Sequence, residues 1–86
     1  MNTIPNNKIL ENIVKAAMEN KTVAITYKDT KGVISERETE PYEIKNEKYW
    51  GYCSNKNSIR QFSLANILGA RITENKYIPR WEVKIQ

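Results

Sequence analysis

Two arginines, Arg37 and Arg60, are the residues of this sequence whose chemistry points most directly to a function. Arg60, Phe62 and Leu64 occupy alternate positions, so a strand here would place all three on one face, with the guanidinium group among apolar side chains. Because a guanidinium group holds a phosphate or a carboxylate through two parallel hydrogen bonds, the two arginines predict a site for an anionic ligand. The alternative is that each arginine lies along the surface and pairs with an acid. The acids near Arg37 are Glu36, Glu38, Glu40 and Glu43.

Aromatic side chains stand close to these arginines in the sequence and offer flat faces on which bases stack, at about 1–3 kcal/mol per base. We assign Tyr27 and Phe62 to the core, because so small a domain needs most of its large side chains there. Consecutive residues of a strand face opposite sides, so at least one of Tyr49, Trp50 and Tyr52 points outward. We expect Tyr52 and Trp50 to complete the ligand-binding site.

The residue types needed for catalysis or metal binding are scarce. The sequence has no histidine and one cysteine, Cys53, so the commonest general base and the usual zinc ligands are largely missing. The serines have no histidine to activate them, and the three glycines are single turn residues rather than a phosphate-cradling loop. The alternating glutamates from Glu36 to Glu40 are interpreted as a solvated acidic stripe. We expect a protein that is not an enzyme and holds no cofactor or metal.

Charge is spread unevenly along the 86 residues, whose net charge is +4. Residues 29–47 carry six acids against three bases, whereas residues 48–86 carry seven bases against two acids. This asymmetry favours an anionic partner for the C-terminal half, such as single-stranded RNA or DNA or a nucleotide. The apolar runs are too short for a membrane span, the start lacks the apolar segment of a secretory signal, and one cysteine fits a reducing compartment. We expect a cytoplasmic protein that has no membrane partner.

One amphipathic helix is predicted at the N-terminus, capped by Asn6 or Asn7 and ending near Asn20. We expect its apolar stripe to plug one end of a sheet or barrel. A partner-binding or membrane-surface helix is the alternative, which is less favoured because only two basic residues line its polar face. The apolar residues at helical spacing are Ile9, Leu10, Ile13, Val14 and Ala17.

Short strands joined by tight turns account for the rest of the chain. Pro41 interrupts the second strand and predicts an edge, a bend or a bulge there. Trp81, Val83 and Ile85 alternate with polar residues, so the C-terminus is predicted to be a closing edge strand that offers a dimer seam, unless its charges serve to discourage pairing. The expected strands cover residues 22–28, 33–40, 49–53, 58–64, 69–73 and 77–86.

The predicted chain consists of one helix followed by strands whose connections are too short for crossovers. This order is typical of a mainly β protein with one N-terminal helix. We expect a small SH3/Sm-like antiparallel β-barrel of five or six strands. All of residues 1–86 form a single domain, comprising the helix at 1–20, a barrel at 22–73 and the edge strand at 77–86.

The order of several short motifs resembles the bacterial WYL-domain family over about residues 22–72. The motifs are Val23-x-Ile25-x-Tyr27, Gly32, Ser35-x-Arg37-x-x-x-Pro41-Tyr42-x-Ile44, Gly51-Tyr52-Cys53 and Arg60-x-Phe62-x-Leu64-x-x-Ile67. The resemblance implies a barrel similar to SH3 and Sm folds. It also implies a role in sensing ligands or binding nucleic acid, usually behind a DNA-binding domain in transcription regulators.

This sequence departs from the family pattern at functional positions. The name-giving Trp-Tyr-Leu falls on Glu47, Lys48 and Tyr49, and Ser63 and Asn66 stand where the family has arginines. Of the family's basic ligand cluster, only Arg37 and Arg60 remain. The first 20 residues hold one helix, whereas a helix-turn-helix needs at least two.

Two functions from different classes follow. The first is a non-enzymatic regulatory or ligand-sensing module of WYL type, which binds single-stranded nucleic acid or a nucleotide in transcriptional or defence-related regulation. The second is a protein-interaction adaptor or dimerising accessory protein, encoded by a phage or mobile element and acting on a host regulator or polymerase through Trp81, Val83 and Ile85. The chain would act as a monomer or a homodimer.

Overall fold

The N-terminal helix, α1 (Asn7–Glu19), forms where the apolar residues recur at helical spacing, in a computed structural model that describes residues 7–85. Ile9, Ile13, Ala16 and Ala17 are buried on the face that packs against the sheet. The helix ends at Glu19, and the next residue, Asn20, has a φ of 53°, the left-handed conformation common just after a helix. The predicted helix and its role as a plug on the sheet are confirmed, while the possible cap Asn6 lies outside the described residues.

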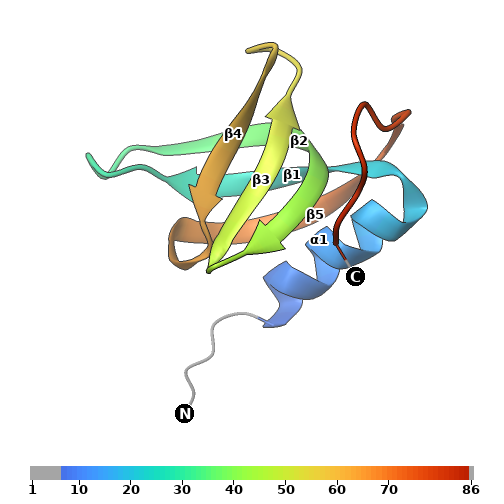
Figure 1. The fold of residues 1–86 in the computed structure, drawn as a ribbon. Helices are drawn as coiled ribbons and strands as arrows, with labels where there is room; N and C mark the ends of the chain where they lie inside the picture. Colours follow the sequence, from blue (N-terminus) through green and yellow to red (C-terminus); the bar gives the residue numbers. More distant parts are fainter. Residues whose placement is uncertain (1–6, 86) are drawn as a thin grey trace.

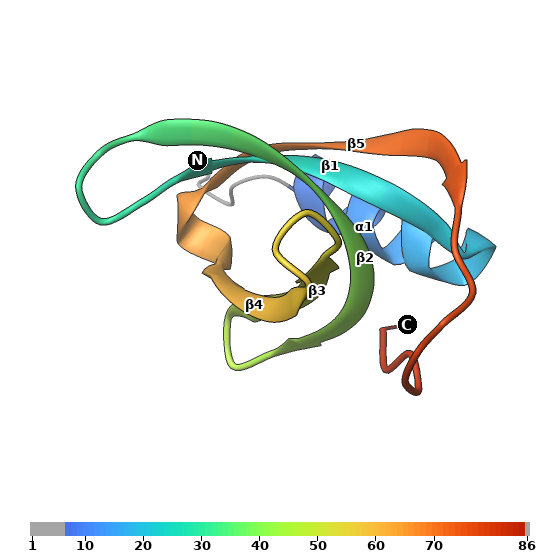
Figure 2. The same ribbon diagram turned by 90° about the horizontal axis from the view of Figure 1, so that it is seen from above.

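Five antiparallel strands follow in the order β4-β3-β2-β1-β5 (Figure 1). The strand β2 bends sharply, so that the sheet wraps around one side of the core when viewed from above (Figure 2). A 3-10 helix (Leu64–Asn66) joins the last two strands. The strands are β1 (Lys21–Lys28), β2 (Ile34–Lys45), β3 (Lys48–Cys53), β4 (Ser58–Ser63) and β5 (Ile67–Lys76).

The bend in β2 lies at Pro41, as predicted. The first half of β2 pairs with β1, from Ile34 to Thr39, and the second half pairs with β3, with a register shift between Pro41 and Glu43. Proline has no backbone N–H to donate to a ladder, so a buried proline is tolerated where pairing changes partner. The bulge at Pro41 is therefore the hinge that folds β3 and β4 over β1 and β5.

The sheet is not closed into a barrel. The mainly β class, the single helix and the antiparallel sheet are confirmed, but within residues 7–85 the edge strands β4 and β5 do not pair with each other. The apolar face of α1 joins the core that includes Phe62 of β4 and Ile67 of β5. The helix thus covers side chains that closure of a barrel would otherwise cover.

Two aromatic rings lie at the centre of this core. Tyr49 and Phe62 stack with centroids 5.9 Å apart, and Tyr27 meets Phe62 edge-on at 5.0 Å. The hydroxyl of Thr39 donates to the carbonyl of Val23 at 3.1 Å and is hydrogen-bonded to the Tyr49 hydroxyl at 2.7 Å. Burial raises the pKa of Tyr49 far above its usual value, so this hydroxyl stays neutral. The assignment to the core is confirmed for Phe62, whereas Tyr27 is half-buried and packs against the core.

The predicted edge strand over residues 77–86 is wrong for the part that the structure describes, up to Ile85. This tail is irregular, and over the described residues it pairs with β2 as a strand at one isolated parallel bridge, between Glu43 and Lys84. Its backbone donates instead to Tyr42: the Arg80 N–H reaches the Tyr42 hydroxyl at 2.9 Å and the Lys84 N–H reaches the Tyr42 carbonyl at 2.7 Å. Contacts with one aromatic residue therefore replace the ladder of a strand.

Within residues 7–85, no helix has the length and apolar character that crossing a membrane requires.

Candidate functional site

Arg37 and Arg60 both project from the inner face of the curved sheet. Residues directly opposite each other in an antiparallel pair share a face. Arg37 lies opposite Ile25, which is fully buried, and Arg60 lies opposite Gly51, which is packed against the Tyr49 ring. Arg37 is half-buried and Arg60 is exposed. We refer to these two residues as the arginine pair.

Both charges of the arginine pair act on the thiol of Cys53. Cys53 is buried at the end of β3, and burial raises the pKa of its thiol. The positive charges of Arg37 and Arg60, with that of Lys56 in the β3–β4 turn, oppose this rise. Strands β2 and β4, which are not neighbours in the sheet, therefore each place one guanidinium group on the inner face.

Three of the four acids near Arg37 in the sequence have other partners. Glu36 lies 3.5 Å from Arg71, and Glu40 lies 3.2 Å from Arg80. Glu38 accepts hydrogen bonds from Thr22 and Asn75, which lower its pKa. Among residues 7–85 no ion pair involves either member of the arginine pair. The alternative pairing of each arginine with a neighbouring acid is therefore not seen among these residues.

Tyr52 and Trp50 do not lie with the arginine pair. In the β3–β4 register Trp50 is opposite Gln61 and Tyr52 is opposite Ile59, which places both aromatic rings on the outer face. The physical reason is the two-residue period of a strand, because Tyr49, Gly51 and Cys53 point inward. The predicted four-residue site is thus divided between two faces.

The C-terminal tail covers the outer face of the sheet instead. The Arg80 guanidinium lies over the Tyr52 ring, 4.2 Å from its centroid, and is held by Glu40. Trp81 packs edge-on against Tyr42 at 5.3 Å and tilted against Tyr52 at 5.8 Å. Sequence reasoning missed the roles of Tyr42 and Arg80, because the two residues lie 38 positions apart and no local pattern joins them.

The three residues predicted to form a partner interface occupy different environments. Trp81 is 50% exposed, Val83 is half-buried and packs against the core, and Ile85 is buried within it. The structure therefore does not present them together as an exposed seam.

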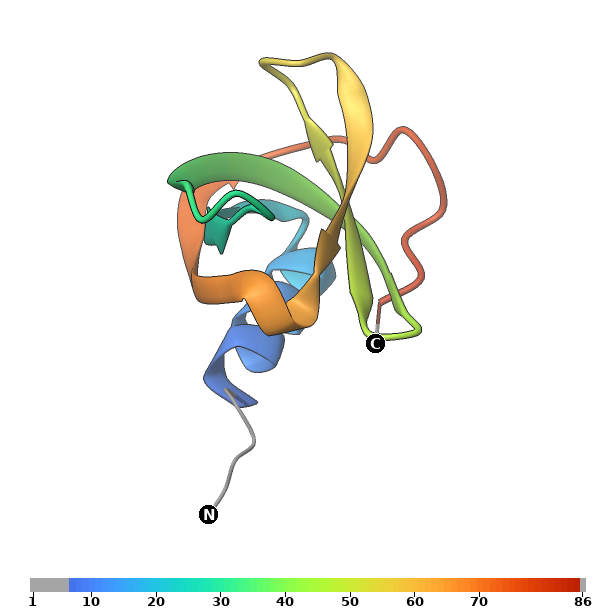
Figure 3. The ribbon, with the colours of Figure 1, turned by 90° about the vertical axis from the view of Figure 1, so that its left-hand side faces the viewer.

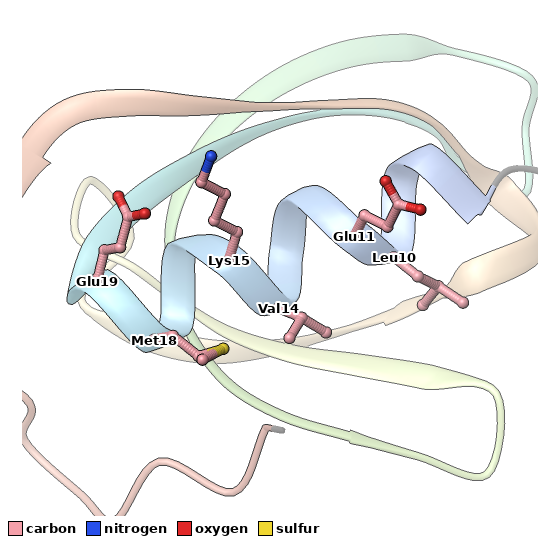
Figure 4. Close-up of a pocket in the computed structure, with 6 residues that line it drawn as sticks. All are labelled: Leu10, Glu11, Val14, Lys15, Met18 and Glu19. Atoms are coloured by element: carbon pink, nitrogen blue, oxygen red, sulfur yellow. The ribbon is translucent and has the colours of Figure 1, made fainter.

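A second surface feature lies along one side of α1. Figure 4 shows Leu10, Val14 and Met18 on one side of the helix and the charged residues on the other. Leu10 is 37% exposed and Met18 is 73% exposed. This apolar stripe borders a shallow hollow, whose charged lining residues are Glu11, Lys15 and Glu19.

Comparison with known proteins identifies the fold. Residues 8–72 match the sequence profile of the WYL domain. The structure is similar to proteasome accessory factor B/C (PafBC) of Arthrobacter aurescens, with a TM-score of 0.73 and 17% sequence identity over 93% of this chain. This chain spans only 14% of the length of that protein. A comparison of the sequence with curated proteins finds no match.

Proposed function

Because this chain belongs to the WYL-domain family, we propose that it is a regulatory module that senses an anionic ligand through Arg37 and Arg60. The ligand we propose is a nucleotide or a short segment of single-stranded RNA or DNA. The module would act in transcriptional or defence-related regulation in the cytoplasm of a bacterium. We propose binding alone, with no catalytic step.

The observation that supports this proposal is the position of two arginines, both outside any ion pair among the described residues, on the inner face of the sheet. Charge-assisted hydrogen bonds from a guanidinium group to a phosphate are stronger than neutral ones, particularly where apolar side chains limit access of water. Phe62 supplies such an apolar side chain, two residues from Arg60 on the same strand face. The site therefore has both the charge and the surroundings for a phosphate.

A stacking residue is also present on the inner face. Tyr27 is half-buried, contacts Phe62 edge-on, and lies opposite Ser35 of β2, two residues from Arg37. We therefore propose Tyr27, rather than Tyr52 or Trp50, as the aromatic group beside a bound base. Two guanidinium groups suit one or two phosphates, which favours a short ligand over a long nucleic-acid backbone.

Fluorescence anisotropy tests the proposal. Labelled single-stranded RNA and DNA oligonucleotides are titrated with the protein at two salt concentrations, with unlabelled nucleotides as competitors. We expect salt-sensitive binding that Arg37→Gln and Arg60→Gln each weaken by about tenfold or more, as expected when a charge-assisted contact is lost. Arg71→Gln is the matched control, because it removes the same charge from an exposed arginine of the outer face.

Two results would refute the site. Equal weakening by all three substitutions would mean that only net charge matters. No binding at low salt, where electrostatic attraction is strongest, would exclude the nucleic-acid ligand altogether.

The second candidate function is the adaptor or dimerising accessory protein, and the exposed apolar stripe of α1 favours it. Here the partner would be a second copy of the chain. Sedimentation of the wild-type protein and of Met18→Lys tests this function. A dimer that the substitution dissociates would support it, whereas a monomer at all concentrations would exclude it.

A further inference from the structure

The outer face of β3 and β4 carries a hollow that the proposed anion site does not use. The C-terminal tail runs outside β2, as Figures 2 and 3 show, and forms one wall of this hollow. Its volume is about 500 Å³. The lining residues are Tyr42, Glu43, Trp50, Ile59, Trp81, Glu82 and Lys84.

Aromatic rings supply most of the apolar lining. Trp81 comes from the tail and Trp50 from β3, so the two indole rings reach the hollow from different segments. Trp81 is 50% exposed and Trp50 is half-buried, so both present ring surface to a ligand. The edge-on contact between Tyr42 and Trp81 holds the wall formed by the tail.

The charged residues that line the hollow indicate whether it would bind a cation or an anion. Glu43 and Glu82 supply two carboxylates against the single ammonium group of Lys84. Among residues 7–85 neither carboxylate is in an ion pair. A hollow with net negative charge and exposed aromatic rings repels phosphate and attracts a cation.

The molecule already contains one cation on this aromatic surface. Arg80 lies 4.2 Å above the centroid of Tyr52, and Glu40 holds it there by a charge-assisted hydrogen bond. This contact occupies Tyr52 and leaves Trp50 and Trp81 as the accessible rings of the cluster, with Tyr42 buried behind them. The electrostatic attraction that places Arg80 would act equally on a cation entering from solvent.

We propose that this hollow binds a small organic cation that carries a quaternary ammonium group. Such a group is weakly hydrated and presents apolar methyl groups with a distributed positive charge, which matches two tryptophan rings bordered by carboxylates. A primary amine is strongly hydrated and gains less from the same surroundings. The site is independent of the arginine pair, from which it is separated by the thickness of the sheet.

Titration of the full chain with choline chloride tests the proposal. The readouts are tryptophan fluorescence and the NMR signals of the two indole N–H groups, with sodium chloride at equal ionic strength as the blank. The neutral isostere 3,3-dimethylbutan-1-ol has the same shape without the charge. We expect saturable binding of choline that shifts both indole signals, and at least about tenfold weaker binding of the isostere.

Charge variants keep the test independent of folding. Glu43→Gln and Glu82→Gln are expected to weaken choline binding severalfold, and Lys84→Gln to strengthen it, because each changes the charge without removing an aromatic wall. Trp50→Leu is expected to abolish it. Arg60→Gln, the variant that tests the anion site, should leave choline binding unchanged, so the two proposals fail separately.

Three results would overturn the inference. The first is equal affinity for choline and its neutral isostere. The second is a change in choline affinity, in the three charge variants, that is opposite to the one expected or too small to measure. The third is that binding does not saturate at choline concentrations on the order of 100 mM, because a specific site would bind choline more tightly than that.

Discussion

Replacing Gly51 by alanine should destabilise the fold, because the new methyl group has no room. A Cβ atom built there would lie 2.7 Å from the Tyr49 hydroxyl oxygen and 3.0 Å from the Cβ of Thr39. Both neighbours are buried side chains that cannot turn away into solvent. Gly51 itself does not have a positive φ, so the effect comes from contact and not from backbone strain.

The magnitude follows from three contributions. Overpacking a core costs about 1–3 kcal/mol, and restriction of the unfolded chain by alanine offsets about 0.4–1 kcal/mol of this. Displacement of the Tyr49 ring would also strain its 2.7 Å hydrogen bond to Thr39, worth about 1 kcal/mol. We expect a net loss of about 2 kcal/mol, equivalent to a fall in Tm of roughly 10 °C for a domain of this size.

Urea unfolding followed by tryptophan fluorescence measures this loss as a lower midpoint at unchanged slope. Gly69→Ala is the matched control, because Gly69 also lies in a strand and its Cβ would meet only the Thr26 hydroxyl, at 3.9 Å. The control should stay within about 0.5 kcal/mol of the wild type. The reasoning fails if both substitutions lower the midpoint equally, or if Gly51→Ala leaves it unchanged.

Three further predictions concern stability. Hydrogen bonds from Thr22 and Asn75 lower the pKa of Glu38 below its ordinary value of 4.5, so its contribution is present above that pH and is lost as the pH falls through the folded-state pKa. Glu38→Gln should therefore reduce the pH dependence of unfolding between about pH 5 and pH 3, and an unchanged dependence would contradict this assignment. Ile13→Ala, at a fully buried position, should cost about 2–5 kcal/mol in a denaturant titration, and a cost below 1 kcal/mol would mean that α1 is not anchored in the core. Gly32→Ala should cost about 1 kcal/mol because φ there is 85°, whereas Gly32→Asn should cost less in the same assay; equal costs would argue against backbone strain.

Local features of the fold were predictable from sequence because their causes are local. The helical spacing of Ile9 and Ile13 marks α1, and the missing N–H of Pro41 marks the bulge in β2. The alternation of Arg60 with Phe62 also indicates correctly that this arginine shares a strand face with a core residue. Each inference needs only the period of a helix or strand, or the covalent structure of one residue.

The division of the predicted site between two faces required the tertiary structure. Trp50 and Tyr52 stand next to inward-facing residues in the sequence, but whether the odd or the even residues of β3 face the core depends on its pairing with β2 and β4. A shift of one residue in that register would exchange the two sets of side chains. The sequence around Arg60 therefore shows which residues are close to it in the chain, but not which of them share a face of the sheet with it.

The sequence by itself determined the helix, the succession of strands along the chain and the hairpin turns, and it identified the two arginines as candidate ligand-binding residues. These features depend on residue type and short-range periodicity. Only the tertiary structure decided that the sheet stays open beside α1 and that the tail packs across β2 and β3. The contact of Arg80 with Tyr52 and that of Trp81 with Tyr42 join residues 28 and 39 positions apart, respectively. Such contacts arise from competition among many apolar surfaces for burial, which no local pattern resolves.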